Sequence, residues 1–440
     1  MILTTPTRLF QNGLYRWCFL ALFLSVVLGS GLYLNYNGKN LPRSSETMRG
    51  IFGTLGKRST DSQSGQWYRV QGGSMAPTLY GDCRSFSCQQ CGLASPFFNF
   101  DQHGTRPPKL TCSHCGIFEN NLVRSEESSG QLVRVNHFTS GVDLKEILRR
   151  GDLVAIKKDD AVHIKRLVGL PNDWVDSEGL HLKISGQRVE DMILSQANQF
   201  PLPWLLVDLD SARLVSRWKN SVKISDASED VLADDWIRSE LRSWECSEET
   251  NHWLVYQHRS QTQGSIPSPV WDDCVFNTGL SRKLHLVNRL RLSGESLGKG
   301  DVEFVFWTTE GARHVMKSFQ GPAKFTIRSI EGDLLSSEAS AEIPISDVMV
   351  IGIHLLSGTV ELKDLKIDRS VEYRWRPNDD RPTPFQLSAD EWFVLGDNVP
   401  VSKDSREWGA IRSAELIGLV DQATKFASPS LHELMGRIDD

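Results

Sequence analysis

The stretch from His285 to Trp375 constrains the fold of this chain more than any other segment. It contains several short runs in which apolar and polar residues alternate, and turn-forming residues separate these runs. Alternation with a period of two places apolar side chains on one face of a β-strand and polar side chains on the other. The pattern therefore predicts a β-sandwich-like module at 285–375 and, with strand-like runs elsewhere, a mainly β chain.

Composition limits the class of partner. The chain has 440 residues, enough for two or three domains, and 40% hydrophobic with 24% charged residues is typical of globular proteins. The formal net charge of −6 argues against a nucleic-acid partner, because binding phosphates requires a concentrated basic surface. We therefore expect no nucleic acid among the partners of this protein.

The N-terminal region differs from the rest of the chain. From Trp17 to Leu34 it carries 18 residues without a charge, and as a helix they would span about 27 Å of the roughly 30 Å hydrocarbon core. This predicts a retained, single-pass transmembrane helix in contact with lipid. A cleavable signal peptide is the alternative, although its apolar core is usually shorter. Basic residues lie on both sides of the span, so charge alone does not give the topology.

Ser74 and Lys165 are candidates for nucleophilic chemistry. Ser74 lies in a glycine-rich turn, and Lys165 lies in an apolar, strand-like run. A serine hydroxyl is a weak nucleophile until a base takes its proton. Burial disfavours the charged ammonium, so a buried lysine can serve as that base. Each residue alone has an ordinary explanation, as a turn serine or a surface lysine, and only their context favours Ser-Lys acyl transfer.

Four segments supply that context, in a fixed order along the chain. Together they resemble the boxes of the type I signal peptidase family, the membrane-anchored Ser-Lys leader peptidases (peptidase S26). The third segment has Asn172 where glycine is usual, and the fourth has Val399-Pro400-Val401 in place of a more polar run. The segments are GGSMAPTLYGD (72–82), RGDLVAIK (150–157), HIKRLVGLPND (163–173) and LGDNVPVSKDSREWG (395–409).

The resemblance implies a role for each matching residue. Ser74 would attack the scissile carbonyl, and neutral Lys165 would take its proton and later activate the deacylating water. Some family members have a serine hydroxyl at the position of Gly72 as the second oxyanion donor, so that donor stays open here. The other residues carried over are Ser402, which would orient the lysine, the supporting pair Asp404 and Arg406, and Met75, which would help line the substrate pocket.

Four of the eight cysteines form two C-x2-C pairs with 20 residues between them, the spacing of a four-thiolate zinc ribbon. Disulfides are the alternative in an oxidising compartment. Four protein ligands leave no open position for water, so we expect a structural zinc and no cofactor for catalysis. His114, inside the second pair, is expected to be a bystander. The candidate ligands are Cys88, Cys91, Cys112 and Cys115.

The segments suggest a catalytic β-domain interrupted by inserts. Two local interpretations are a helix at Asp230–Glu245 and a hairpin loop at Gly294–Gly298, which fits a G-x-S-x-G pattern. The expected organisation is an N-terminal tail and transmembrane helix (1–38), a linker (39–66), the first part of the catalytic core (67–82 and 137–180), a zinc-ribbon-like insert (83–136), an irregular insert with a helix (181–284), the β-sandwich-like insert (285–375) and the last part of the core (376–440).

The resemblance implies a membrane-bound serine endopeptidase that removes N-terminal signal peptides from exported preproteins. Its catalytic domain would lie on the extracytoplasmic side of the cytoplasmic membrane and would cut after small residues at positions −3 and −1. The alternative is a catalytically inactive, membrane-tethered scaffold that binds partners through the ribbon and the sandwich. A self-cleaving, repressor-type Ser-Lys protease is a second rival, which the membrane span and the Gly-Asp-Asn segment disfavour.

Overall fold

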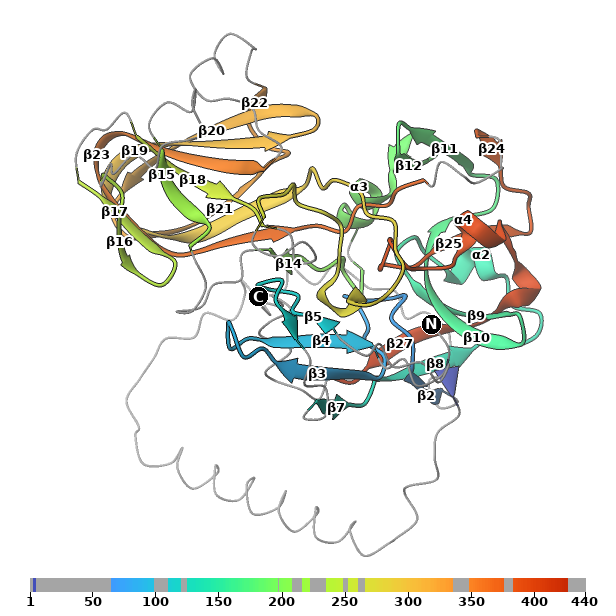
Figure 1. Cartoon of the computed structure of the whole chain (residues 1–440). Coiled ribbons are helices and arrows are strands. Elements are labelled where there is room, and N and C mark those ends of the chain that lie inside the picture. Colours follow the sequence, from blue (N-terminus) through green and yellow to red (C-terminus); the bar gives the residue numbers. More distant parts are fainter. Residues whose placement is uncertain are drawn as a thin grey trace, which may run out of the picture. The chain divides into compact units, whose positions relative to one another are not determined.

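The computed structural model describes residues 3–4, 65–98, 110–119, 125–196, 198–207, 216–221, 235–247, 252–259, 266–334, 348–375 and 383–425. These residues form mainly β-strands, with a few short helices between them (Figure 1), which confirms the prediction of a mainly β chain. The predicted transmembrane helix, and all of the predicted linker except its last two residues, lie outside the described residues. Within the ranges given above, no helix is both long and apolar enough to cross a membrane.

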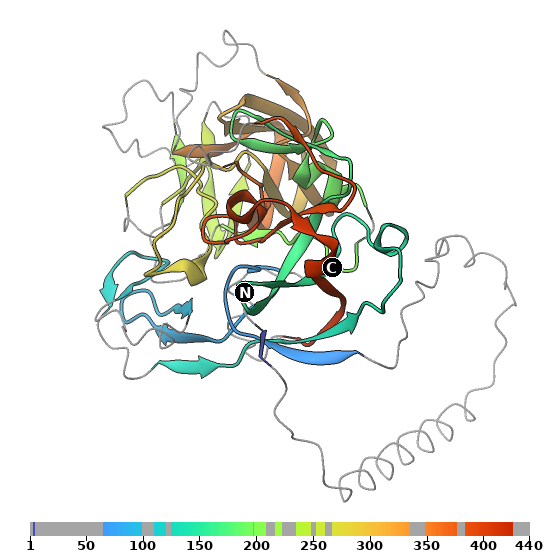
Figure 2. The ribbon, with the colours of Figure 1, turned by 90° about the vertical axis from the view of Figure 1, so that its right-hand side faces the viewer.

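An eight-stranded sheet carries the segments that contain Ser74 and Lys165. In the central strands both faces are covered, so alternate residues enter different cores: Leu153 and Ala155 pack in one cluster, Val154 and Ile156 in another. Figures 1 and 2 both show the C-terminal strand β27, in red, beside strands of the first half. In spatial order the strands are β1 (Leu3–Thr4), β2 (Gln66–Val70), β8 (Leu132–His137), β27 (Leu416–Ala423), β9 (Leu153–Lys158), β10 (Ala161–Gly169), β25 (Glu391–Leu395) and β26 (Ile411–Arg412).

A small four-stranded sheet follows β10. Its core also receives side chains from the helix α3 (Val189–Leu194) and from Tyr373 and Trp375. The short helices α2 (Leu144–Ile147) and α4 (Ser405–Trp408) each begin at an aspartate whose carboxylate accepts a backbone N–H. The strands of the small sheet, in order, are β13 (Gln187–Arg188), β12 (His181–Ile184), β11 (Trp174–Glu178) and β24 (Phe385–Gln386).

The cysteine-containing insert forms short strands. A three-stranded sheet and a two-stranded pair hold the two C-x2-C turns. β8 belongs to the eight-stranded sheet, so the predicted end of this insert at 136 is too late. Val133 and Val135 of β8 face the core and pair with β2 and β27. The insert strands are β4 (Ala94–Phe98), β3 (Cys83–Ser87), β7 (Glu126–Ser128), β5 (Leu110–Thr111) and β6 (Phe118–Glu119).

The largest sheet contains the region predicted as a β-sandwich-like module and begins earlier than predicted, at β14. Two strands, β19 and β23, run its full length and pair with each other. The other partners of β23 lie within 205–257, and the other partners of β19 lie within 311–328. The strands are β14 (Leu205–Leu206), β15 (Trp218–Ser221), β16 (Ile237–Glu240), β17 (Ser243–Cys246), β18 (Trp253–Gln257), β19 (Leu290–Thr308), β20 (Gly311–Gln320), β21 (Ala323–Arg328), β22 (Asp333–Leu334) and β23 (Met349–Arg369).

Strand β19 bends back on itself. Phe325 of β21 pairs in register with Gly294, and Phe304 lies ten positions farther along β19. In a flat strand those positions would be about 33 Å apart, yet the rings of Phe304 and Phe325 are 5.7 Å apart. The two halves of β19 therefore contribute side chains to one hydrophobic core, and the β-sandwich-like arrangement stays a prediction.

The predicted hairpin loop at Gly294–Gly298 is wrong. The segment continues β19, with β21 and β23 pairing on its two sides. Register shifts between Ser293 and Glu295, and between Asp301 and Val302, interrupt the ladder in this region. Such irregularities let a strand bend without ending it.

The predicted helix at Asp230–Glu245 is also wrong over its described part. Residues 237–246 form the hairpin of β16 and β17, with Arg242 at a φ of 61° in the turn. Trp236 and Trp244 are buried in the core of the large sheet. Packing of these two rings stabilises strands more than local helix propensity stabilises a helix.

The fold-back of β19 predicts the effect of one core substitution. Phe325→Ala removes a ring that contacts Phe304 and Phe319, and it should lower the free energy of unfolding by about 3–5 kcal/mol. Urea unfolding measures this loss. Ile330→Ala, at a side chain that is 52% exposed in the same module, is the control and should change stability by less than about 0.5 kcal/mol. Equal effects of both substitutions would contradict the fold-back.

Candidate active site

Ser74 lies in the turn that follows β2. The amide of Ala76 donates to the carbonyl of Gly73 (3.1 Å) and that of Leu79 to the carbonyl of Met75 (2.9 Å), which closes the turn. The residues that follow Ser74, from Met75 to Tyr80, are buried, and Ser74 itself is 9% exposed. The turn therefore holds the hydroxyl in a largely dry environment.

Lys165 lies in the middle of β10 and is fully buried. Its Nζ atom is 3.0 Å from Oγ of Ser74 and 2.9 Å from Oγ of Ser402. The three residues come from the turn after β2, from β10 and from the loop after β25, and long inserts separate them in sequence. The structure thus brings together the predicted nucleophile, the predicted base and the predicted orienting hydroxyl.

Burial lowers the pKa of Lys165 to about 8. An ammonium ion loses its hydration in this site, and the neutral hydroxyls of Ser74 and Ser402 stabilise it less than a carboxylate in direct contact would. The carboxylate of Asp404 opposes the shift, and the guanidinium of Arg406 adds to it. The ring of Trp408 lies 5.4 Å from Nζ and forms an apolar wall. A substantial fraction of Lys165 is therefore neutral near physiological pH.

Asp404 and Arg406 form a fully buried ion pair. Nη2 of Arg406 is 2.7 Å from Oδ2 of Asp404, and the amide of Gly396 donates to the same carboxylate at 2.9 Å. Burial alone would raise the pKa of Asp404, but Arg406 outweighs it and holds the pKa at about 2. The pair ties the start of α4 to the end of β25, as expected for supporting residues.

Arg166, next to Lys165, points to the opposite face of β10 and pairs with Asp397. Nη2 of Arg166 lies 2.6 Å from Oδ2 of Asp397, and both side chains are fully buried. The hydroxyl of Tyr373 donates to Asp397 at 2.6 Å, and that of Thr78 does so too. This network was not predicted from the sequence, although two adjacent cations inside an apolar strand indicate that both side chains are buried.

Met75 is fully buried in the core under the turn, packed with Val70 and Leu79 among others. Its predicted part in lining the substrate pocket stays a prediction. The structure places the backbone of Met75 beside Ser74 and its side chain in the protein interior.

The four cysteines predicted as metal ligands come together at one point. Their sulfur atoms all lie within 4.8 Å of one another, with Sγ–Sγ distances of 3.6 Å for Cys88 and Cys115 and 3.7 Å for Cys91 and Cys112. Tetrahedral zinc with Zn–S bonds of about 2.3 Å separates its sulfurs by about 3.8 Å. The residues present therefore fit a zinc ion, and as a cluster they could bind one.

The two C-x2-C turns have the same geometry. The amides of Gly92 and Gly116 donate to the carbonyls of Cys88 and Cys112, and both glycines have a positive φ, 76° and 73°. That backbone conformation favours glycine. His114 is buried, and its Nε2 lies 2.7 Å from the carbonyl of Ala94. His114 is not among the four side chains of the sulfur cluster, and its role as a bystander stays a prediction.

Comparison with known proteins identifies the family. The family described as signal peptidase, peptidase S26, matches residues 62–229 and 359–424 of this chain, together more than half of it. "Signal peptidase I S" of Bacillus subtilis (strain 168) is 39% identical over 46 residues, which is 10% of this chain. The chain aligns with about a quarter (25%) of that relative's length. The matched segments include Ser74, Lys165 and Ser402, and the chain belongs to the signal peptidase family, peptidase S26.

Proposed function

We propose that the protein is a membrane-bound serine endopeptidase that removes N-terminal signal peptides from exported preproteins. The observation that carries this proposal is the buried Nζ of Lys165, held between the hydroxyls of Ser74 and Ser402. The apolar span at 17–34 supports a location in the cytoplasmic membrane, with the catalytic domain on the extracytoplasmic side. An extended peptide could bind beside Ser74, with small side chains entering shallow pockets.

The chemistry follows from the protonation state of Lys165. A neutral amine has one lone pair, which accepts the Ser74 proton while an amine N–H donates to Ser402 Oγ. Oγ of Ser74 then bonds to the scissile carbonyl carbon, and Lys165 passes the proton to the leaving amine. In the second step Lys165 takes a proton from water, the resulting hydroxide attacks the ester, and Ser74 recovers its proton. The backbone N–H of Ser74 is the first candidate donor to the oxyanion.

Loss of either group should abolish cleavage. Ser74→Ala and Lys165→Ala should each lower kcat for a preprotein by more than about 10⁴-fold, because neither group alone can activate and deliver the nucleophile. The measurement is cleavage of a preprotein by detergent-solubilised full-length protein. Ser388→Ala and Lys157→Ala, at exposed positions, are matched controls with unchanged rates. Undiminished cleavage by Ser74→Ala would overturn the mechanism, and an inactive wild type would favour the scaffold alternative.

The pKa of Lys165 predicts the pH dependence. Only the neutral amine is a base, and its fraction rises as pH approaches the pKa of about 8. We therefore expect kcat/KM to rise about tenfold per pH unit below pH 7 and to level off above pH 8. Initial rates from pH 5.5 to 9.5 test this. A profile that falls between pH 6 and pH 8 would contradict a neutral lysine base.

The cysteine cluster supports a second, structural proposal: a zinc ion held by Cys88, Cys91, Cys112 and Cys115. It would stabilise a small insert that has few apolar core residues. Because four thiolates complete the tetrahedral shell, the ion would take no part in cleavage.

Metal analysis tests the ribbon. The purified full-length protein should contain one zinc per chain, and the double variant Cys88→Ser, Cys112→Ser should contain none. Cys246→Ser removes a buried thiol in the large sheet and should keep the zinc. Zinc retained by the double variant, or disulfides among the four cysteines found by mass spectrometry, would show that the cluster is not a zinc site.

A further inference from the structure

The turn that carries Ser74 is held by Asn398, in the loop after β25. The backbone amide of Asn398 donates to the carbonyl of Ser74 (3.0 Å), and its Nδ2 donates to the carbonyl of Gly73 (2.9 Å). The carbonyl of Asn398 accepts the amide of Ser402 at 2.9 Å. One residue thus connects the two serines whose hydroxyls flank Lys165.

The side chain of Asn398 is paired with that of Asn277. Nδ2 of Asn277 donates to Oδ1 of Asn398 at 2.9 Å, and Nδ2 of Asn398 donates to Oδ1 of Asn277 at 2.7 Å. Asn277 is fully buried and Asn398 is 2% exposed. In such a place each amide needs the other, because an unsatisfied buried polar group costs about 1–3 kcal/mol.

The orientation of both amides is determined at the two ends of the pair. The carbonyl of Gly73 can only accept, so the nitrogen of Asn398 must face it. The carboxylate of Asp273 lies 3.4 Å from Nδ2 of Asn277 and fixes the other amide in the same way. Without Asn277, Asn398 would lose its partner for Oδ1 and one of the two acceptors for Nδ2.

Aromatic packing fixes the position of Asn277. Asn277 is the last residue of the 3-10 helix η3 (Val275–Asn277). The ring of Phe276 in this helix lies 4.9 Å from the ring of Tyr80 and 5.4 Å from that of Phe98. Phe98 in turn covers Gly73, where an added Cβ would lie 2.1 Å from its ring. Segments from the 83–136 insert and the 181–284 insert therefore pack on the turn.

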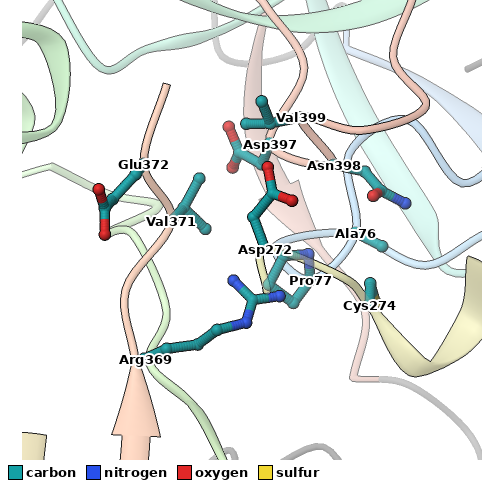
Figure 3. Close-up of a pocket in the computed structure, with 10 residues that line it drawn as sticks. All are labelled: Ala76, Pro77, Asp272, Cys274, Arg369, Val371, Glu372, Asp397, Asn398 and Val399. Atoms are coloured by element: carbon teal, nitrogen blue, oxygen red, sulfur yellow. The ribbon is translucent and has the colours of Figure 1, made fainter. Parts of the chain in front are cut away.

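A small cavity marks where these segments meet. Figure 3 shows Asn398 and Val399 near Ala76 of the turn, with Asp272 and Cys274 of the 272–277 segment beside them. Asp272 and Cys274 precede η3 and belong to the chain between the two segments matched by the family, 62–229 and 359–424. The support of the turn thus includes a segment that the family match does not contain.

We propose that Asn277 is a positioning residue of the active site: through Asn398 it holds the Gly73–Ser74 turn and Ser402 at hydrogen-bond distance from Lys165. This inference rests on the proposed peptidase function for its kinetic test. A shift of about 1 Å in a nucleophile can lower the rate of the chemical step about 100-fold without changing how the substrate binds. Asn277 acts only through Asn398 and contacts no reacting atom.

The test is a kinetic double-mutant cycle in the full-length protein. Asn277→Ala should lower kcat about 10- to 100-fold and change KM less than about twofold. Asn277→Leu keeps the side-chain volume and should show the same loss, because it also lacks the amide. Asn398→Ala combined with Asn277→Ala should be no slower than Asn398→Ala alone, since the two residues act in series. If the fold losses in kcat of the two single variants multiply in the double variant, the proposal is wrong.

Asn220 provides the matched control. Its side-chain amide donates to the backbone carbonyl of Trp236 and accepts from the backbone N–H of the same residue, within the large sheet. Asn220→Ala therefore loses a comparable number of hydrogen bonds, but at residues distant in sequence from the Ser74 turn. It should leave kcat and KM unchanged. An inactive wild type would refute the proposed function, and a crystal structure of Asn277→Leu would then decide the positioning role. Retention of the 2.9 Å bond from Asn398 Nδ2 to Gly73 in that variant would refute it.

Discussion

Burial of two consecutive cations, Lys165 and Arg166, is the constraint on which the site depends. A β-strand sends neighbouring side chains to opposite faces, so each cation meets a different environment. Arg166 cannot lose its proton and is paired with Asp397. Lys165 meets the hydroxyls of Ser74 and Ser402 and can become neutral. One position along β10 thus separates a structural ion pair from a candidate base.

The segment from Gly396 to Arg406, which includes the start of α4, supplies partners to both faces of β10. Asp397 pairs with Arg166, whereas Ser402 contacts Lys165. Asp404 and Arg406 act on Lys165 in opposite senses, because the carboxylate favours the ammonium and the guanidinium disfavours it. Burial decides the net shift of the Lys165 pKa, and the charged pair holds the segment through hydrogen bonds to Gly396 and Val399. The ion pair therefore stabilises the segment, whereas burial lowers the pKa of Lys165.

Much of the site could be predicted from the order of four short segments. Ser74, Lys165 and Ser402 meet as predicted, and Asp404 pairs with Arg406. Their roles in catalysis remain predictions. The four cysteines also converge, since each C-x2-C turn already places two thiolates together.

The features that the sequence did not predict depend on contacts between residues distant in sequence. Nothing near Asn277 indicates that its partner lies 121 positions away. The helix expected at 230–245 failed because Trp236 and Trp244 pack in a sheet core that local periodicity does not reveal. The structural bounds of the inserts differ from the expected ones for the same reason. The strand β8 belongs to the eight-stranded sheet because it pairs with β2 and β27, and its own residues do not indicate this pairing.

Residues of two inserts, 83–136 and 181–284, pack against the turn that carries Ser74. Phe98 of the cysteine-containing insert (83–136) and Phe276 of the 181–284 insert are in contact, with ring centroids 5.4 Å apart. A glycine at position 73 is what allows Phe98 to reach the backbone there. Because an aromatic ring is rigid and the contact has no spare space, movement of either insert would displace the turn. The geometry of the candidate site therefore depends on how the 83–136 and 181–284 inserts pack against the turn.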